Sequence, residues 1–525
     1  YSHFKLKDYS KAIEWFRKYL NFEKDTKSER IADANNRIAD CYFIRRSYWL
    51  AIDYYDKAIE LNLLDKDYAL FQRGFALGLL NRPNKKITTL KTLIAEHPES
   101  AYIDDALYQL GKSYTDIKDD ENSIQKYEKI INDYPTSSYM KKSLVQLGLI
   151  NYNNDNNEAA MKHYKRVVAE YPSTTEAKNS LTGIKNIYVD MGDVDSYFAY
   201  VNGLGDFADV SMSEKDSLTY IAAENIYMKG NCNNSIPAFE KYLQRFNNGQ
   251  FTLNAHFYKA DCQLKNGENK KALKSYSYII SKQKNTFTEQ ALLNAAEINY
   301  NFENYSKALE NYEKLEKIAE VNKHLINARL GMLRTNYNLK DYSKTVISAN
   351  KLIHTEKISQ ALTREAQYKK AMALFNQKNY EMAMDAFRLI SEDVNSSEGA
   401  EAKYRICEIY YFDKQYDIAE HEIFDFIEQK TSQEYWLAKA YILLSDVYLN
   451  KDDNFQAKHT LKSIIENYNS EKSDDIPVIA KEKYNNIIEK EKYNVKSEKE
   501  KDMEINFEEN KSGEYDKLFD EKETK

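Results

Sequence analysis

The chain has 525 residues, of which 30% are charged, and its formal net charge is −7. This charge gives no global attraction to nucleic acid, and a mean hydropathy of −0.74 without any run of about 18 apolar residues excludes a membrane-spanning chain. Only 14 glycines and six prolines interrupt the sequence. Such low usage of turn-forming residues predicts long helices joined by short turns.

The sequence opens with what we interpret as the back half of a repeated unit. Ala12, Phe16 and Tyr19 have the i, i+4, i+7 spacing of a helix stripe that recurs along the chain. We therefore expect residues 1–22 to form the second helix of a truncated repeat.

A period of about 37 residues follows, marked by a small or helix-central position at intervals of 35 to 38 residues. These first positions are Ala39, Gly74, Gly111, Gly148, Lys185, Ala223, Ala260, Ala296, Leu333, Ala371, Cys407 and Ser445. Antiparallel helices approach closely only where one side chain is nearly absent. The spacing therefore predicts a helix centred on each first position.

A second small site lies twelve residues beyond each first position, and in most copies a bulky residue follows four residues later. These second positions are Ala51, Lys86, Ser123, Ala160, Tyr197, Ser235, Ala272, Ala308, Thr345, Ala383, Ala419 and Ala457. Turn-forming pairs such as Asp119-Asp120 separate the two stripes. The pattern predicts an all-α fold, an αα-superhelix of about twelve helix-turn-helix repeats.

Residues 201–217, VNGLGDFADVSMSEKDS, contain the Gly203-x-Gly205-x-x-Ala208 spacing of a dinucleotide-binding loop. We expect neither the preceding strand nor the helix at the third small residue that a nucleotide fold requires. Gly205 instead suits a helix C-cap, and Ser213-x-x-Asp216 suits a capping box for the next helix. We therefore divide the array into 1–205 and 213–470, with a connector at 206–212 where we expect the superhelical path to change.

The periodicity fades after Ile464. Residues 471–525 carry 17 acids and 12 bases, so the array before them is nearly neutral. Within this segment, we expect residues 471–496 to form one terminal helix. Residues 497–525 are charged and poor in aliphatic residues, which predicts a disordered tail.

No pattern in the chain points to catalysis. The cysteines are Cys41, Cys232, Cys262 and Cys407; they lack CxxC spacing, and we interpret them as small buried residues rather than a disulfide framework or zinc site. The eight histidines are scattered, and no HExxH, Walker A or G-x-S-x-G motif occurs. We expect no enzyme activity, no cofactor and no metal.

The best-preserved copies resemble the tetratricopeptide repeat. Its pattern is Leu-Gly-x-x-Tyr in the first helix, then a small residue, an aromatic residue and Pro. The matching residues are Leu110, Gly111, Tyr114, Ser123, Tyr127 and Pro135 in one copy, and Leu147, Gly148, Ala160, Tyr164 and Pro172 in the next. The resemblance covers about residues 30–470, although the tryptophan position of the family is not kept.

Stretches with "YPxS" ahead of an "LGxxY" helix are also similar to repeats of bacterial envelope proteins, namely the outer-membrane assembly lipoprotein and the Tol-Pal coordinator. This resemblance implies a periplasmic or outer-membrane-associated protein, with the cytoplasm as the alternative. A signal peptide or lipid anchor would lie outside the given residues.

In the tetratricopeptide family the first helices line a concave surface. The resemblance implies that residues at −6, −3, +1 and +4 from each first position face a groove. The expected groove residues are Asp105, Tyr108, Tyr220, Glu224, Phe257, Asp261, Glu297, Tyr300, Tyr337, Glu365, Tyr368, Glu401, Tyr404, Glu408 and Tyr411. At −6 and +1 we count ten acids against four bases, the bases being Lys112, Lys142, Arg334 and Lys439.

We call the residues at each of these four positions a row. The four rows predict a non-catalytic scaffold that binds a protein or peptide bearing Lys or Arg in an acidic, aromatic-lined groove. A structural subunit of a larger envelope assembly is the alternative function. A second interpretation of the rows stays open, in which the +4 residues pack between helices and the acids are solvated. Because no basic stripe accompanies the aromatics, we expect no nucleic-acid partner, and we expect no direct membrane insertion.

Overall fold

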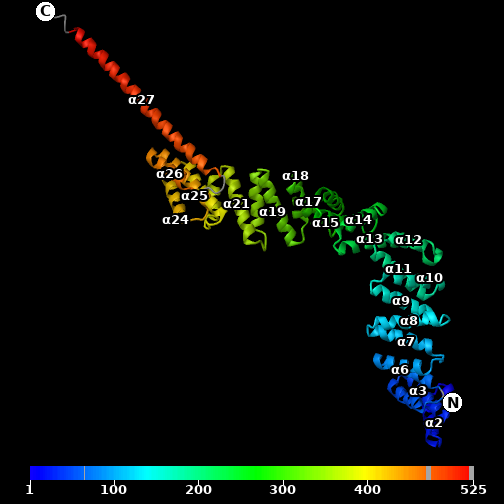
Figure 1. The fold of residues 1–525 in the computed structure, drawn as a ribbon. Helices are drawn as coiled ribbons and strands as arrows, with labels where there is room; N and C mark the ends of the chain where they lie inside the picture. Colours follow the sequence, from blue (N-terminus) through cyan, green and yellow to red (C-terminus); the bar gives the residue numbers. More distant parts are fainter. Residues whose placement is uncertain (64, 469–473, 520–525) are drawn as a thin grey trace, which may run out of the picture. The chain divides into compact units, whose positions relative to one another are not determined.

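The computed structural model describes residues 1–63, 65–468 and 474–519, and every element in these ranges is helical (Figure 1). The all-α fold class is therefore confirmed. The chain forms two compact units, Tyr1–Asn266 and Gly267–Lys525. In chain order, the odd-numbered helices from α3 to α25 are the first helices of the pairs and the even-numbered helices from α4 to α26 are the second helices.

The helices of the first unit have the following bounds: α1 Ser2–Lys5, α2 Tyr9–Phe22, α3 Glu29–Ile44, α4 Tyr48–Leu61, α5 Lys66–Leu79, α6 Pro83–Glu96, α7 Ile103–Asp116, α8 Asp120–Asp133, α9 Met140–Asn153, α10 Asn157–Glu170, α11 Thr175–Asp190, α12 Val194–Asn202, the short 3-10 helix η1 Gly205–Ala208, α13 Met212–Met228, α14 Cys232–Arg245 and α15 Thr252–Lys265.

The helices of the second unit have these bounds: α16 Asn269–Ile280, α17 Thr288–Asn301, α18 Tyr305–Ile318, α19 Asn322–Asn338, α20 Tyr342–Ile353, α21 Gln360–Asn376, α22 Tyr380–Arg388, α23 Ser397–Phe412, α24 Tyr416–Glu428, α25 Glu434–Asn450, α26 Asn454–Asn467 and α27 Ile476–Phe519.

The turn inside each pair has a recurring two-residue design. A residue with positive φ ends the first helix, and the next residue is the N-cap of the second helix. At Lys118 φ is 62°, and the side chain of Asp119 then accepts a hydrogen bond from the Asn122 backbone N–H. Gly192 and Asp193 repeat the arrangement before α12. The cap satisfies a backbone donor that would otherwise lack a partner, which makes such short turns stable.

The small positions lie where helices meet, as the period predicts. All twelve second positions are buried, and so are the first positions apart from Lys185, which is partly exposed. Inside each unit, a second helix packs against the first helix of its own pair and against the first helix of the next pair. The core is therefore a row of small clusters rather than one centre.

Tyr164 shows why some of these positions must be glycine. Its ring lies against Gly148 of its own pair and against Gly183 of the next pair. A methyl group added at residue 183 would lie 2.5 Å from the ring, and one added at Gly148 would also overlap it. The tyrosine thus fills the space that two missing side chains leave, and the same contact joins Tyr312 to Gly331.

The connector differs in detail from the capping that we expect. Helix α12 ends at Asn202 with Gly203 as its C-cap, so Gly205, whose φ is 64°, lies beyond the cap. Helix α13 begins two residues earlier than expected because Ser211 is its N-cap and accepts from the Glu214 backbone N–H. The change of superhelical path at 206–212 stays a prediction.

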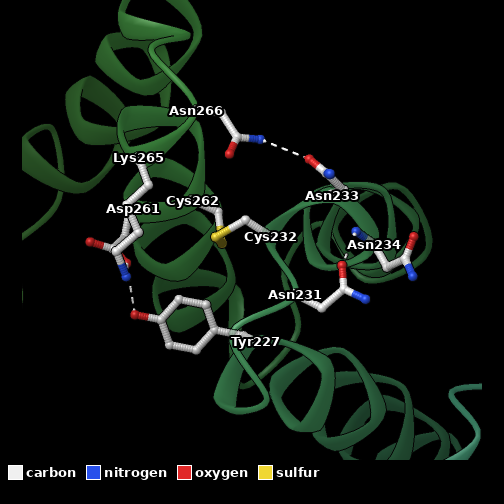
Figure 2. The surroundings of a disulfide bond; sticks show 9 residues. All are labelled: Tyr227, Asn231, Cys232, Asn233, Asn234, Asp261, Cys262, Lys265 and Asn266. Atoms are coloured by element: carbon white, nitrogen blue, oxygen red, sulfur yellow. Dashed lines mark hydrogen bonds and ion pairs between the residues drawn. A yellow bond between two sulfur atoms is a disulfide. The ribbon is translucent and has the colours of Figure 1, made fainter.

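The prediction of four unpaired cysteines is wrong for two of them. Cys232, the first residue of α14, and Cys262 of α15 form a disulfide, with their Cα atoms 5.1 Å apart (Figure 2). A hydrogen bond from Asn266 to Asn233, 3.2 Å long, lies beside it. The contact between α14, the second helix of one pair, and α15, the first helix of the next, brings together two positions that are 30 residues apart in sequence. Cys41 and Cys407 are buried free thiols, as expected.

The C-terminal segment is more helical than its composition predicts. Helix α27 runs from Ile476 to Phe519, past the expected end of the terminal helix at 496, while residues 520–525 lie outside the described ones. Glu and Lys are good helix formers, so a stretch with few aliphatic residues can still be helical. Its first turns pack on α26 and α25, where Ile476, Ala480 and Ile487 are buried.

Candidate functional site

The expected groove residues lie on the odd-numbered helices, but several serve as contacts between successive repeats. Tyr108 stacks on Tyr139, which precedes α9, with ring centroids 4.5 Å apart. Tyr220 stacks on Phe251, which precedes α15, at 4.4 Å. The ring of Tyr404 lies 5.6 Å from that of Trp436 on α25.

The rings at −3 are buried to different degrees. Tyr220 is only 3% exposed and Tyr404 only 9% exposed, whereas Tyr108 and Phe257 are half-buried. The ring contacts of Tyr108, Tyr220 and Tyr404 with the neighbouring repeat therefore stabilise the array.

The hydroxyls of three tyrosines at −3, Tyr220, Tyr368 and Tyr404, donate to carboxylates at −6 or +1. Tyr368 donates to Glu401 on the next odd helix at 2.6 Å, and Tyr220 donates to Glu224 at 2.6 Å. Burial, and then the carboxylate partner, raises the pKa of both phenols, so both stay neutral donors at all ordinary pH values.

A second set of tyrosines joins neighbouring repeats from the +4 positions. Tyr300 accepts a hydrogen bond from Asn338 at 3.0 Å, and Tyr411 accepts one from Asn450 at 3.2 Å. Tyr337 lies under the ammonium of Lys369, 4.4 Å from its ring centroid. These contacts hold the rings in place while leaving them half-buried at the surface.

Arginines neutralise much of the acidic row in the second unit. Arg334 makes two hydrogen bonds of 2.7 Å to the two oxygens of Glu365. Arg405 bonds to Glu401 at 2.9 Å and to Glu408 at 2.7 Å. Counting only the −6 and +1 positions missed Arg405, because it lies two residues before its first position. The surface is thus less acidic than the count predicts.

Three expected acids lack a Lys or Arg partner in the part of the chain that the structure describes. They are Asp105, Glu224 and Glu297. Burial raises the pKa of the Asp105 carboxyl, which a hydrogen bond from Tyr139 partly offsets. Asp261 differs, because it accepts from Tyr227 at 2.8 Å and pairs with Lys265 at 2.6 Å.

Two pockets open between successive first helices at equivalent places in the repeat. The Glu297 pocket, of about 250 Å³, lies between α17 and α19 and is lined by Glu297, Tyr300, Asn301, Tyr312, Asn327, Leu330, Gly331 and Arg334. The Lys86 pocket, of about 310 Å³, lies between α5 and α7 and is lined by Phe75, Gly78, Leu79, Asn81, Pro83, Lys86, Gln109, Lys112, Ser113 and Asp116. Both contain the +1 and +4 residues of one first helix.

The pockets combine groups that the sequence pattern separates. The Glu297 pocket brings together the expected residues Glu297 and Tyr300 with the base Arg334. The Lys86 pocket holds the base Lys112 together with Lys86, which the pattern treats only as a packing position. Within the described residues no cluster of three or more His, Cys, Asp or Glu could hold a metal, and no helix is long and apolar enough to cross a membrane.

The helices of this chain define an α-helical repeat protein built from stacked helix pairs, with pockets between the first helices of two repeats. Residues 68–100, 105–137, 142–174 and 365–393 match the family model of the tetratricopeptide repeat. The chain therefore contains tetratricopeptide repeats, and this part of the resemblance is confirmed. No curated protein matches the chain.

Three solved structures align with this chain at low identity. A tetratricopeptide repeat protein from Parabacteroides merdae ATCC 43184 is 18% identical, with 51% of this chain and 99% of that chain covered and a TM-score of 0.28. The tetratricopeptide repeat domain of P58(IPK) is 12% identical over 81% and 99%, with a TM-score of 0.22. Naa15/Naa10 bound to HypK-THB is 10% identical over 93% and 78%, with a TM-score of 0.36. All three scores lie below 0.5, so the fold rests on the helices of this chain and its matched repeats.

Proposed function

We propose that the protein is a non-catalytic scaffold that binds a segment of another protein along its first helices. The observation that carries this proposal is the recurrence of half-buried tyrosines on the first helices of several repeats, with pockets at equivalent places of two of them. Tetratricopeptide-repeat proteins commonly act as protein-interaction scaffolds. A surface whose side chains are already held by hydrogen bonds loses little conformational entropy when a segment docks.

The unpaired carboxylates favour a segment that bears Lys or Arg. Glu224 and Glu297 have no cationic partner among the described residues, and each lies beside tyrosine rings. A cation placed there gains both a charge partner and an aromatic face. Glu365, Glu401 and Glu408, which arginines already neutralise, contribute less to this attraction than their number predicts.

Affinity capture with cross-linking from the native cell tests the scaffold function. We expect cross-links from a partner to concentrate on odd-numbered helices, around residues such as Tyr300 and Tyr411. Cross-links confined to even-numbered helices would contradict the proposal and favour a subunit that is embedded in an assembly by its outer face.

We further propose that the protein works in the periplasm or at the outer membrane. The disulfide between Cys232 and Cys262 supports this location, because such bonds persist in oxidising compartments and are rare in the cytosol. Cell fractionation followed by thiol labelling under native redox conditions tests it. A cytosolic protein with four free thiols would contradict the location while leaving the scaffold function untouched.

A further inference from the structure

The last four second helices, α20, α22, α24 and α26, expose large apolar side chains. These residues are Ile347, Met382, Ile418, Phe424, Phe455 and Ile465. Among the described residues, the second helices from α6 to α18 expose none. Single exposed apolar residues are common on protein surfaces, whereas a group confined to one part of an array indicates a surface that contacts another molecule.

A pocket of about 440 Å³ opens between two of these helices, α25 and α26, and we call it the α25–α26 pocket. Its lining includes Ala438 and Ile464, which are buried, and Leu437, which is half-buried. Glu434 and Ser463 line it from exposed positions. The volume is that of a site for a small ligand or a bulky side chain.

The exposed apolar side chains reach this pocket. His459 lines the pocket and stacks on Phe455, which is 72% exposed, with ring centroids 6.4 Å apart. A molecule that fills the pocket can therefore bury the Phe455 ring as well.

The α25–α26 pocket is separate from the expected groove. The groove positions of α25 are Lys439, Ile442, Asp446 and Leu449, and the lining contains none of them. The pocket therefore lies on another side of the first helix.

A smaller pocket, of about 290 Å³, has the same place two pairs earlier. Both pockets are lined by the residue four before the first position and by the residues two, three and six after the second position. The smaller pocket includes the exposed residues Met382 and Leu389. The recurrence indicates that the α25–α26 pocket results from the repeat geometry and is not an isolated gap.

The charge of the lining indicates the kind of occupant. Of its ten residues, Glu434 is the one acid and none is Lys or Arg. Glu434 has no Lys or Arg partner among the described residues, whereas both lysines of α26 pair with carboxylates, Lys458 at 2.7 Å and Lys462 at 3.7 Å. A cation at the rim gains the Glu434 carboxylate, and the tyrosines of the lining can add aromatic faces.

We infer that the α25–α26 pocket binds a bulky apolar side chain of a partner protein that has a Lys or Arg next to it in sequence. The apolar side chain replaces water against Leu437, Ala438 and Ile464, and the cation pairs with Glu434. The inference rests on the proposed scaffold function in that a partner protein supplies the segment, but it uses a surface outside the groove.

The test uses saturation-transfer difference NMR on the full chain with dipeptide probes. The probes are acetyl-Phe-Lys amide, acetyl-Phe-Glu amide and acetyl-Ala-Lys amide. We expect acetyl-Phe-Lys amide to bind about threefold or more tightly than either of the others, because only this probe has both the ring and the cation.

Matched variants assign the signal to the pocket. Ser463→Phe fills the pocket from an exposed position and should weaken binding about tenfold or more, whereas Gln456→Phe, exposed on the same helix but outside the lining, should have no effect. Glu434→Gln should weaken binding about threefold, and Glu428→Gln, an exposed acid outside the lining, should not. Circular dichroism verifies that each variant keeps its helices.

A groove variant separates this inference from the proposed function. Glu224→Lys combined with Glu297→Lys should leave the binding that Ser463→Phe removes. If the groove variant removes the signal and Ser463→Phe does not, the probe binds in the groove, which supports the scaffold proposal and contradicts the inference.

Three further outcomes would overturn the inference. They are no signal from acetyl-Phe-Lys amide, an equal signal from either of the other dipeptides, and stronger competition by phenethylamine than by acetyl-Phe-Lys amide. The last result would assign the pocket to a small amine instead of a protein segment.

Discussion

At the scale of single residues, the fold depends on contacts in which a ring replaces missing side chains. The contact of Tyr164 with Gly148 leaves no room for a methyl group. Gly148→Ala should therefore lower the free energy of unfolding by about 1–3 kcal/mol through overpacking. Urea unfolding measures the change.

A second substitution separates overpacking from other effects of the alanine. In a Tyr164→Leu background the ring is absent, so Gly148→Ala should cost less than in the wild-type chain. Equal costs in the two backgrounds would mean that the ring is not what excludes the methyl group.

Lys86 makes stability depend on pH in a direction set by its burial. Its pKa is about 8 in the folded chain and about 10.5 when unfolded, so folding releases a proton between these values. The stability of the wild type relative to Lys86→Met should be lowest below pH 8 and rise up to about pH 10.5. Below pH 8, Lys86→Met should be more stable by about 3 kcal/mol.

Urea unfolding at pH 7 and at pH 10 checks this dependence. Lys85→Met, at the exposed neighbouring position, corrects for the titration of other groups. A difference between Lys86→Met and wild type that does not change with pH would show that the ammonium is not buried in solution.

At the scale of elements, the disulfide ties α14 to α15. In the chain-entropy account, closing a loop of about 30 residues stabilises the contact between these two helices by about 3.6 kcal/mol. Replacing Cys232 and Cys262 by Ser should therefore speed hydrogen exchange in α14 and α15 more than in the distant helix α7. A reductant should have the same effect on the wild type and none on the double variant.

The thiol count provides a direct check of the pairing. Unfolded without reductant, the chain should show two free thiols, Cys41 and Cys407, and four after reduction. Four thiols before reduction, in protein kept under oxidising conditions, would contradict the disulfide.

The elements themselves could be predicted because the period repeats the same local chemistry. Small residues at intervals of about 37 locate the helices, and Asp or Asn after a turn marks where a second helix begins. The disulfide could not be predicted, since pairs 30 residues apart follow no local rule. The site was predicted only in part. Arg405 lies outside the −6, −3, +1 and +4 positions, and Lys86 occupies a second position, where the pattern predicts only a packing residue.

At the scale of the whole molecule, attraction for a basic partner should depend on the few acids that remain unpaired. Changing Glu224 and Glu297 together to Lys should weaken binding of an oligo-lysine peptide about tenfold or more at low salt, with less effect at high salt. Fluorescence anisotropy with a labelled peptide measures the affinity.

A control with the same change in net charge uses exposed acids of the second helices, Glu128→Lys with Glu158→Lys. It should leave the affinity nearly unchanged. Equal losses in both variants would mean that the peptide responds to total charge and not to the first helices.

The position of Tyr164 between Gly148 and Gly183 also has a consequence for how such a chain can be lengthened or shortened. Tyr164 and Gly148 belong to one repeat, whereas Gly183 belongs to the next. The packing contact therefore spans the boundary between two sequence repeats. A deletion that removes one whole period, such as residues 112–148, joins Gly111 to the helix that leads to Tyr164 and preserves the contact. A deletion between Gly148 and Tyr164 changes their spacing and separates the ring from its glycine, so we expect the removal of a whole period to be tolerated better than a shorter deletion inside a helix pair.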